Sequence, residues 1–386
     1  MRKETKKTEY VHKAVCFVDS ITFFRKKLWI ILSLSVLMLS GCTARNTVEQ
    51  EAVSEEKEVE TFSITDFVMD TVLNETIYGS TDLTGDIKEL LSKIETEQLS
   101  WRIDDSEVAK INARCSEGAG VSMSDDFYQW TKTALDLAKK SDGAFDPTIG
   151  KLTRLWNIEG ENPTVPEQSD IEQALSEIGY EHINIEEKEK MISMDAGCTL
   201  DLGAVGKGIG CDEVREYLTE QDDVSGAVIA IGGSILVYGN KPDGTDWSVA
   251  VQDPEGEDGT YMGVLHLSGT TCISTSGDYE KYFEQDGKRY HHILDPSTGY
   301  PSESGLSSVT IICPNEGEWK QYAGLLSDGL STACFVLGEE KGMELLEKYG
   351  MEGIFIDQNK NVSVTEGIAD QFEILNEEYQ IFLKSA

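Results

Sequence analysis

The run GAVIAIGGSILVYG, residues 226–239, constrains the fold more than any other stretch of this chain. It is apolar and rich in β-branched residues, which favour strands. Polar residues do not alternate with the apolar ones, as they would in a strand with one face in water. Gly232 and Gly233 interrupt the run near its middle, where a turn is expected. The stretch therefore predicts two buried strands joined by a turn.

Helix and strand patterns alternate over the rest of the chain, and no internal repeat is present. Helices are expected where apolar residues recur at helical spacing and glycine or an acidic residue stands at an end, at 85–99, 125–143, 169–180, 327–338 and 340–350. Further strands are expected at 247–254 and 307–314. The mixture predicts an α+β fold, formed by one compact two-lobed unit over 61–386 rather than by a doubly wound sheet.

The N-terminus differs in composition from the rest of the chain. Residues 1–41 hold eight basic and three acidic side chains, and an apolar run, LWIILSLSVLML, ends just before the sequence LSGC. The run is short for a membrane span but suits a signal peptide. LSGC resembles the lipobox of bacterial lipoproteins, which implies cleavage of a signal peptide at 1–41 and lipidation of Cys42. The alternative is a simple N-terminal anchor helix.

Residues 42–60 are polar, acidic and free of aromatics, so we expect a flexible tether between the lipid and the folded unit. The lipid would hold the folded unit on a membrane. A net charge of −37 excludes nucleic acid as a partner, because phosphate binding needs clustered lysine and arginine. Six cysteines follow the tether without metal-ligand spacing, and we expect them to be buried as small apolar side chains, although a disulfide is possible.

Three glycine-rich or acidic stretches stand out. SDGAFDPTIG at 141–150 has the residues of a turn, which is also its simplest interpretation. DLGAVGKGIG at 201–210 lacks the spacing of a dinucleotide fingerprint or a P-loop, but Lys207 can neutralise a phosphate. In SDGLST at 327–332, a helix would place Asp328 and Thr332 on one face, where their oxygens suit Mg²⁺; a helix cap and a core threonine are the alternative.

Two of the five histidines of the chain are adjacent, in YHHILDPSTGYP at 290–301. A histidine near its ordinary pKa suits a general base at neutral pH, and the aspartate that follows can orient it. The alternative is a polar loop without function. If His292 has an ordinary pKa, the rate of a reaction that depends on it should fall below about pH 6.

These stretches occur in one order over about 280 residues, together with FVMDT (67–71), DSEVAKIN (105–112), AIGGSI (230–235) and STSGDYEKYF (274–283). In this combination the chain resembles the FAD:protein FMN transferase family, the ApbE-like proteins. The resemblance implies that the protein binds FAD and transfers its FMN half to a Thr or Ser hydroxyl of a partner flavoprotein, releasing AMP. The implied location is the outer face of the cytoplasmic membrane, in agreement with the lipobox. The implied partners are flavin-carrying subunits of membrane redox complexes, and the implied metal is Mg²⁺.

The resemblance also assigns residues. It implies His292 and Asp295 as catalytic residues, and Mg²⁺ ligands from the Ala204 carbonyl and the side chains of Asp328 and Thr332. The FAD-binding residues that it implies are Met69, Ala144, Phe145, Asp146, Asp201, Lys207, His292 and Leu294.

Two positions depart from the family pattern. The usual Met-Gly-Thr reads Met69-Asp70-Thr71, and Trp101 or Arg102 stands where many members have a tyrosine over the flavin. Either side chain can stack on a flavin. Because this change bears on the exclusion of water, an FAD pyrophosphatase that gives FMN and AMP is the alternative activity. A lipid-anchored solute-binding protein without catalysis is the alternative from another class.

Overall fold

The computed structural model describes residues 59–257 and 259–384. Its largest element is a nine-stranded sheet in the order β1-β2-β6-β7-β10-β13-β14-β15-β17. Neighbouring strands are antiparallel except β15 and β17, which are parallel. The strands of this sheet are β1 (Glu60–Val68), β2 (Thr71–Gly79), β6 (Val224–Ile231), β7 (Ser234–Gly239), β10 (Thr271–Gly277), β13 (Leu306–Pro314), β14 (Glu352–Asp357), β15 (Asn361–Thr365) and β17 (Gln380–Lys384).

The run at 226–239 forms two neighbouring strands of this sheet, as predicted. β6 and β7 pair as an antiparallel hairpin, with Ile231 opposite Ser234. Gly232 makes the turn at φ +55, and a Cβ there would lie 2.5 Å from the Thr71 hydroxyl. Glycine is therefore required by both the backbone conformation and the neighbouring strand. This turn and the Thr71 end of β2 lie at the same end of the sheet.

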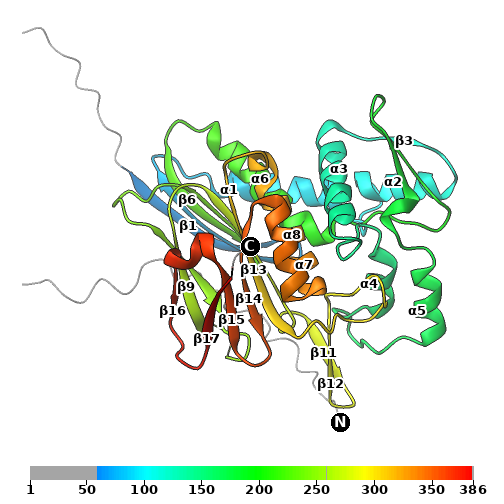
Figure 1. The fold of residues 1–386 in the computed structure, drawn as a ribbon. Coiled ribbons are helices and arrows are strands. Elements are labelled where there is room, and N and C mark those ends of the chain that lie inside the picture. The colour runs from blue at the N-terminus through cyan, green and yellow to red at the C-terminus, as the bar shows by residue number, and fades with distance from the viewer. Residues whose placement is uncertain (1–58, 258, 385–386) are drawn as a thin grey trace, which may run out of the picture.

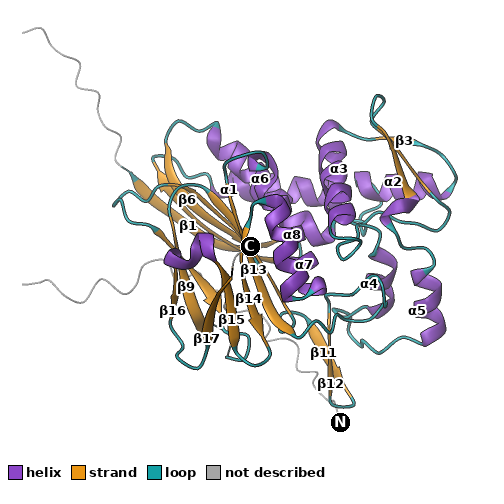
Figure 2. Ribbon diagram, viewed as in Figure 1, coloured by secondary structure: helices purple, strands orange, loops and turns teal. Residues whose placement is uncertain are grey.

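Helices cover one face of the sheet and extend beyond it into a helix-rich half (Figures 1 and 2). The helices are α1 (Thr84–Lys93), α2 (Glu107–Ser116), α3 (Asp125–Lys140), α4 (Gly150–Trp156), α5 (Gln168–Leu175), α6 (Gly203–Thr219), α7 (Ala323–Leu337) and α8 (Glu339–Tyr349), with a π-helix at Ile94–Leu99 and 3₁₀ turns at Tyr180–His182, Lys320–Tyr322 and Glu366–Gln371. Within the described residues, no helix is both long and apolar enough to cross a membrane.

The glycine-rich stretch at 201–210 forms the start of α6, which the sequence did not predict. A Cβ on Gly208 would meet the Gly324 carbonyl oxygen at 2.1 Å, and one on Gly324 would meet the Gly208 oxygen at 2.2 Å. These glycines therefore let α6 and α7 pack with their backbones in contact. The close approach places Lys207 of α6 beside Asp328 of α7.

Three small sheets complete the fold. They are β16-β9-β8, formed by β8 (Trp247–Gln252), β9 (Tyr261–Leu267) and β16 (Phe372–Ile374); β3-β5-β4, formed by β3 (Val121–Ser122), β4 (Ile183–Glu186) and β5 (Met191–Met194); and the hairpin of β11 (Tyr282–Gln285) and β12 (Lys288–His291). The first of these shares a buried apolar cluster with β6, β7, β10 and the last strands of the large sheet. The hairpin β11–β12 projects from the lower edge in Figure 1.

The structure confirms a mixed α+β fold with a sheet-rich and a helix-rich half (Figure 1). The predicted helix at 85–99 is confirmed, and its second part is a π-helix from Ile94. The helix that begins at Asp125 ends at Lys140, and Gly143 follows it at φ +79. Cys115, Cys198, Cys211, Cys272, Cys313 and Cys334 are buried and free, as expected for small apolar side chains. The predicted signal peptide, Cys42 and nearly all of the tether lie outside the described residues.

Candidate active site

A pocket of about 550 Å³ lies at one end of the large sheet, between the sheet and the helix-rich half. The β1–β2 turn, the β6–β7 turn and the end of β10 form the sheet side. Helices α4, α6 and α7 and the segment after β12 form the remaining walls. The predicted site residues in its wall are Met69, Trp101, Arg102, Asp201, Ala204, Lys207, His292, Leu294, Asp328 and Thr332. The fold thus brings together residues that are up to 263 positions apart, Met69 and Thr332.

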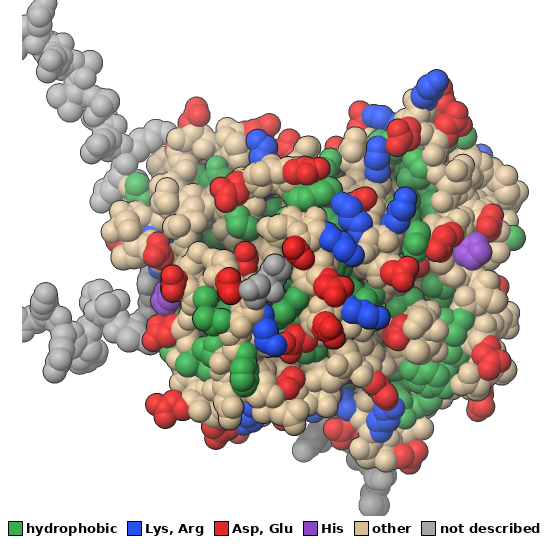
Figure 3. Space-filling view, in the orientation of Figure 1, with side chains coloured by type: hydrophobic (Ala, Val, Ile, Leu, Met, Phe, Trp, Pro, Cys, Tyr) green, Lys and Arg blue, Asp and Glu red, His purple; other side chains and the backbone are tan. Residues whose placement is uncertain are grey.

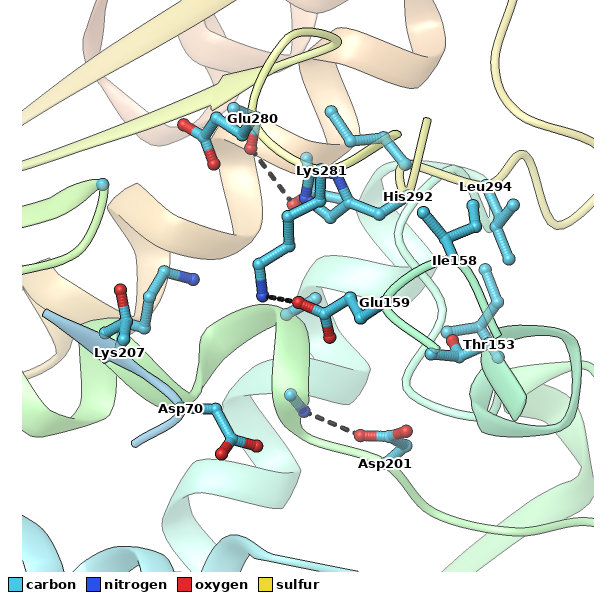
Figure 4. A pocket seen from close by; sticks show the side chains of 18 of the residues that line it. Asp70, Thr153, Ile158, Glu159, Asp201, Lys207, Glu280, Lys281, His292 and Leu294 are labelled. Carbon is cyan, nitrogen blue, oxygen red and sulfur yellow. Dashed lines mark hydrogen bonds and ion pairs between the residues drawn. The ribbon is translucent and has the colours of Figure 1, made fainter. Parts of the chain in front are cut away.

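The start of α6 gives the pocket a place for negative charge. Gly203, Ala204 and Lys207 line it, and an N-terminal helix turn offers free N–H groups and a positive dipole end. Asp201 stands just before this helix, where its Oδ1 accepts a hydrogen bond from the Gly203 N–H at 2.9 Å (Figure 4). Burial raises the pKa of Asp201, and the Gly203 bond and the Arg154 charge partly oppose this shift.

The buried Asp328 and the half-buried Lys207 form an ion pair in the wall of the pocket. Lys207 Nζ lies 3.0 Å from Asp328 Oδ1, and the Gly208 N–H donates to Asp328 Oδ2 at 3.0 Å. Burial opposes the charge on Lys207, but the Asp328 carboxylate outweighs it and raises the pKa of the amine. The Lys207 amine thus stays charged and can exchange Asp328 for an anionic ligand, which would leave the carboxylate for a cation.

The predicted metal ligands fit a hard cation. Asp328 and Thr332 lie one helical turn apart on α7, and both line the pocket with Ala204. In a regular helix, the Gly208 N–H would donate to the Ala204 carbonyl oxygen. Here the same N–H donates to Asp328 Oδ2, so the Ala204 carbonyl oxygen has at most a shared hydrogen bond from it and can accept a cation. One carboxylate, one hydroxyl and one carbonyl are oxygen ligands of the kind that Mg²⁺ prefers. No group of three His, Cys, Asp or Glu suited to a metal occurs in the described residues, and the predicted set needs none.

The two adjacent histidines have different surroundings. His292 lines the pocket, and its Nδ1 is buried without a hydrogen-bond partner. His291 is buried outside the pocket wall, where its Nε2 is 3.0 Å from the Ser302 carbonyl oxygen and its Nδ1 accepts from the Ile293 N–H. The structure therefore leaves His292 free to meet a ligand and uses His291 to hold the loop.

The expectation of an ordinary pKa for His292 is wrong. Burial lowers its pKa to about 3, and the positive charges of Lys281, His291 and Lys207 act in the same direction. The imidazole is therefore neutral at every pH at which the protein is expected to work. A neutral imidazole can accept a proton, but a base this weak contributes less than one with a pKa near 7.

Asp295 does not line the pocket, and its carboxylate has a structural role. Oδ1 accepts hydrogen bonds from the backbone N–H and the hydroxyl of Ser297, at 2.8 and 2.7 Å. The Asp295 carbonyl oxygen also accepts from Gly299 N–H at 2.8 Å. Asp295 thus shapes the DPSTG turn, and this geometry does not support its predicted role beside His292.

Ala144, Phe145 and Asp146 also lie outside the pocket wall. Asp146 is buried, and it accepts hydrogen bonds from the N–H and hydroxyl of Thr148 and from the Tyr180 N–H at 2.9 Å. Its carboxylate ties the end of the α3–α4 loop to Tyr180. This placement supports the turn interpretation of the stretch rather than the predicted contact with a cofactor.

Trp101 and Arg102 both line the pocket, and a second arginine joins them. The guanidinium carbons of Arg102 and Arg154 lie 4.6 and 4.8 Å from the centre of the Trp101 ring. Arg102 Nη1 is 3.2 Å from Asp70 Oδ2. The two departures from the family pattern are therefore in contact, because Asp70 stands at one of them and Arg102 at the other.

Sequence reasoning missed four charged residues of the wall: Arg154, Glu159, Glu280 and Lys281. Lys281 forms an ion pair with Glu159 across the pocket (Figure 4). Burial raises the pKa of Glu280 to about 7, against the positive charges of Lys207 and Lys281. Glu280 and Lys281 stand in the quoted stretch STSGDYEKYF, which was a signal for them, whereas the segment of Arg154 and Glu159 has no distinguishing pattern.

Comparisons with known proteins show relatives over most of the chain. The model of the ApbE family matches residues 69–355. The FAD:protein FMN transferase of Treponema pallidum is 31% identical over 82% of this chain and 90% of its own length. That of Vibrio cholerae is 31% identical over 83% of this chain and 90% of its own length.

Solved structures show the same fold. The ApbE protein of Thermotoga maritima has a TM-score of 0.71 and 32% identity, over 81% of this chain and 99% of its own. The flavin transferase ApbE of Vibrio cholerae has a TM-score of 0.68 and 30% identity, over 78% and 94%. On the family match and these relatives, the chain belongs to the ApbE family.

Proposed function

We propose that this protein is an FAD:protein FMN transferase, which moves the FMN half of FAD to a Thr or Ser hydroxyl of a partner flavoprotein and releases AMP. The observation that carries the proposal is the Lys207–Asp328 pair at the start of α6, in a pocket of about 550 Å³. A lysine, a helix N-terminus and a set of oxygen ligands suit a bound pyrophosphate. The family membership and the names of the relatives support the same reaction.

In the proposed reaction, the acceptor hydroxyl oxygen bonds to the phosphorus of the FMN half, and the bond from that phosphorus to the AMP phosphate breaks. The hydroxyl proton passes to His292, whose Nε2 is the available nitrogen because Nδ1 is buried. Lys207 neutralises the pyrophosphate oxygens, and the guanidinium planes of Arg102 and Arg154, which lie over the Trp101 ring, offer a surface on which a planar base can stack. AMP leaves with the electrons of the broken bond.

Mg²⁺ would be held by Asp328, Thr332 and the Ala204 carbonyl, and would neutralise charge on the phosphates and the departing AMP. Phosphoryl transfer depends mainly on such charge neutralisation and alignment. The Lys207 amine, released from Asp328 when the cation binds, would then be free to contact a phosphate.

Product analysis distinguishes the transferase from the alternatives. The protein is incubated with FAD and Mg²⁺, with and without a flavin-acceptor domain. AMP with protein-bound FMN supports transfer, whereas AMP with free FMN in both reactions would show a pyrophosphatase. FAD that stays intact in both would favour a binding protein.

The proposal includes a lipid anchor at Cys42 on the outer face of the cytoplasmic membrane, after a signal peptide at 1–41, with 42–60 as a tether. Its support is the LSGC sequence after the apolar run. The proposed acceptors are accordingly flavin-carrying subunits of membrane redox complexes. Cys42→Ser should leave the signal uncleaved or release the protein from the membrane fraction, and normal processing and anchoring of this variant would contradict the anchor.

A further inference from the structure

An exposed aromatic side chain stands beside the pocket on the β1–β2 hairpin. Phe67 is 62% exposed, more than any other large apolar side chain of the described residues. It is two residues before Met69, and Met69 and Asp70 form the hairpin turn with φ of 54° and 55° and line the pocket. Two residues span at most about 7 Å. The backbone of Phe67 therefore lies within about 7 Å of a residue that lines the pocket.

The strand that carries Phe67 also has a free edge. β1 is the first strand of the large sheet, and it pairs with β2 alone among the strands of the described residues. A free strand edge presents N–H and C=O groups to which an extended segment of another protein can add as a new strand. At Phe67 the N–H already donates to Asp66 Oδ1 at 2.8 Å, so an added strand pairs with the edge groups that precede it. Such a segment, following β1 to its end, arrives at the hairpin turn and the pocket.

The outward face of this strand is uncharged. Ser63 and Thr65 share the face of Phe67, and their hydroxyls bond to Thr76 and Asn74 of β2. The chain has a net charge of −37, and Figure 3 shows acidic side chains spread over the face it presents. A neutral strip next to the pocket lets a partner approach without like-charge repulsion or the desolvation of ions.

We propose that the free edge of β1 and the Phe67 side chain form the docking surface for the acceptor protein, which adds an extended segment to β1 and covers Phe67 with an apolar side chain. The hydroxyl to be modified then enters the pocket past the Met69–Asp70 turn. This inference rests on the proposed transfer reaction, since only a protein acceptor needs a surface at the pocket edge.

The opposite edge of the sheet supplies a matched control. β17 exposes Ile381, Phe382 and Leu383, with Phe382 45% exposed, yet none of its residues lines the pocket. If the acceptor bound to any exposed apolar side chain, removing Phe67 or Phe382 would weaken acceptor binding equally. The proposal requires that only the loss of Phe67 weakens it.

The test compares full-length wild type, Phe67→Ala and Phe382→Ala, with a recombinant flavin-acceptor domain that wild type modifies. Transfer is measured at saturating FAD and Mg²⁺ while the acceptor concentration varies, and acceptor binding is measured separately without FAD. An exposed anchor of this kind contributes about thirtyfold when removed. Phe67→Ala should therefore raise KM and the Kd for the acceptor about thirtyfold, with kcat and FAD binding by flavin fluorescence unchanged. Phe382→Ala should match wild type in all four.

Each other result contradicts the docking surface. An unchanged acceptor KM and Kd in Phe67→Ala would overturn it, and so would an equal loss in both variants. Weaker acceptor binding in Phe382→Ala alone would place the docking surface on β17. A change in the oligomeric state of Phe67→Ala without loss of acceptor binding would show that the β1 edge binds a second copy of this chain. If wild type converts FAD but modifies no acceptor, the transfer reaction fails and the inference fails with it, which the intact wild-type control reveals.

Discussion

Three carboxylates of the pocket have cationic partners, whereas a carboxylate on the buried face of β2 has none in the described structure. In the pocket, Asp328 faces Lys207, Glu159 faces Lys281 and Asp70 faces Arg102. On β2, Glu75 is 2% exposed, and both of its oxygens lack a hydrogen-bond partner in the described structure. Burial, with the charges of Asp82 and Asp66, raises the pKa of Glu75 to about 8.

The difference shows what a cationic partner changes for a carboxylate. A paired carboxylate can give up its cation to the phosphates of a ligand. An unpaired carboxylate takes up a proton instead and costs stability. If this comparison holds, changes to the charged residues of the pocket affect turnover or FAD binding, whereas changes to Glu75 affect stability alone.

The largest effect is expected from Asp328→Ala. It removes the carboxylate of the proposed metal site and leaves Lys207 without its partner. The loss of several kcal/mol of charge stabilisation should slow Mg²⁺-dependent turnover about 10³-fold or more. Initial rates of AMP release at several Mg²⁺ concentrations check it. Asp295→Asn, which alters a carboxylate outside the pocket, is the control and should stay near wild type; near-normal rates for Asp328→Ala would remove Asp328 from the site.

A smaller effect is expected from His292→Ala. Because its pKa is about 3, His292 is a weak base, so the loss should lie near the lower end for general bases, about 10²-fold. FAD binding should persist. In wild type, His292 should cause no fall in rate between pH 7 and pH 5, since it stays neutral there. His291→Ala should lower the melting temperature rather than kcat, and the reverse pattern would mean that the roles of the two histidines are exchanged.

Glu280→Gln should change the pH dependence of FAD binding. With a pKa of about 7, Glu280 is mostly neutral at pH 6 and anionic at pH 8, where it repels phosphates. FAD affinity of wild type, measured without divalent ions, should thus fall as pH rises through 7, by at most about tenfold per pH unit for one linked proton. Glu280→Gln should flatten this dependence. An unchanged slope in the variant would place the ionisation elsewhere.

The smallest effect is on stability alone. The folded state holds a proton on Glu75 up to about pH 8, whereas an unfolded glutamate releases it near 4.5, so the free energy of unfolding should decrease as pH rises between these values. Glu75→Met removes a buried polar group without a partner and should stabilise the protein by about 1–3 kcal/mol at pH 8. Urea unfolding at pH 5 and pH 8 measures both.

Glu75→Gln is the control for that comparison. It abolishes the titration but keeps a polar group in the core, so it should lose the pH dependence without the full gain in stability. A destabilised Glu75→Met would show that Glu75 makes a stabilising contact. A Glu75→Gln that keeps the wild-type pH dependence would place the ionisation on another group.

The strand pair at 226–239 was predictable because a turn signal and an apolar run coincide in a short segment. Asp328 and Thr332 were predictable because their spacing depends on one helix. By contrast, the helical start of α6 was hidden by glycines, whose role is set by Gly324, more than a hundred residues later. The pocket pairs Lys281–Glu159 and Arg102–Asp70 likewise join distant segments, and the pKa of His292 depends on burial that local sequence does not reveal.

The most direct test of the account is the intact mass of a flavin-acceptor domain after incubation with wild-type protein, FAD and Mg²⁺. The account predicts a mass increase equal to one FMN joined with loss of water, mapped by peptide fragmentation to a Thr or Ser side chain, with AMP released in equal amount. Asp328→Ala should leave the acceptor mass unchanged over the same time. An unmodified acceptor in the wild-type reaction, with FAD either intact or cleaved to free FMN, would contradict it.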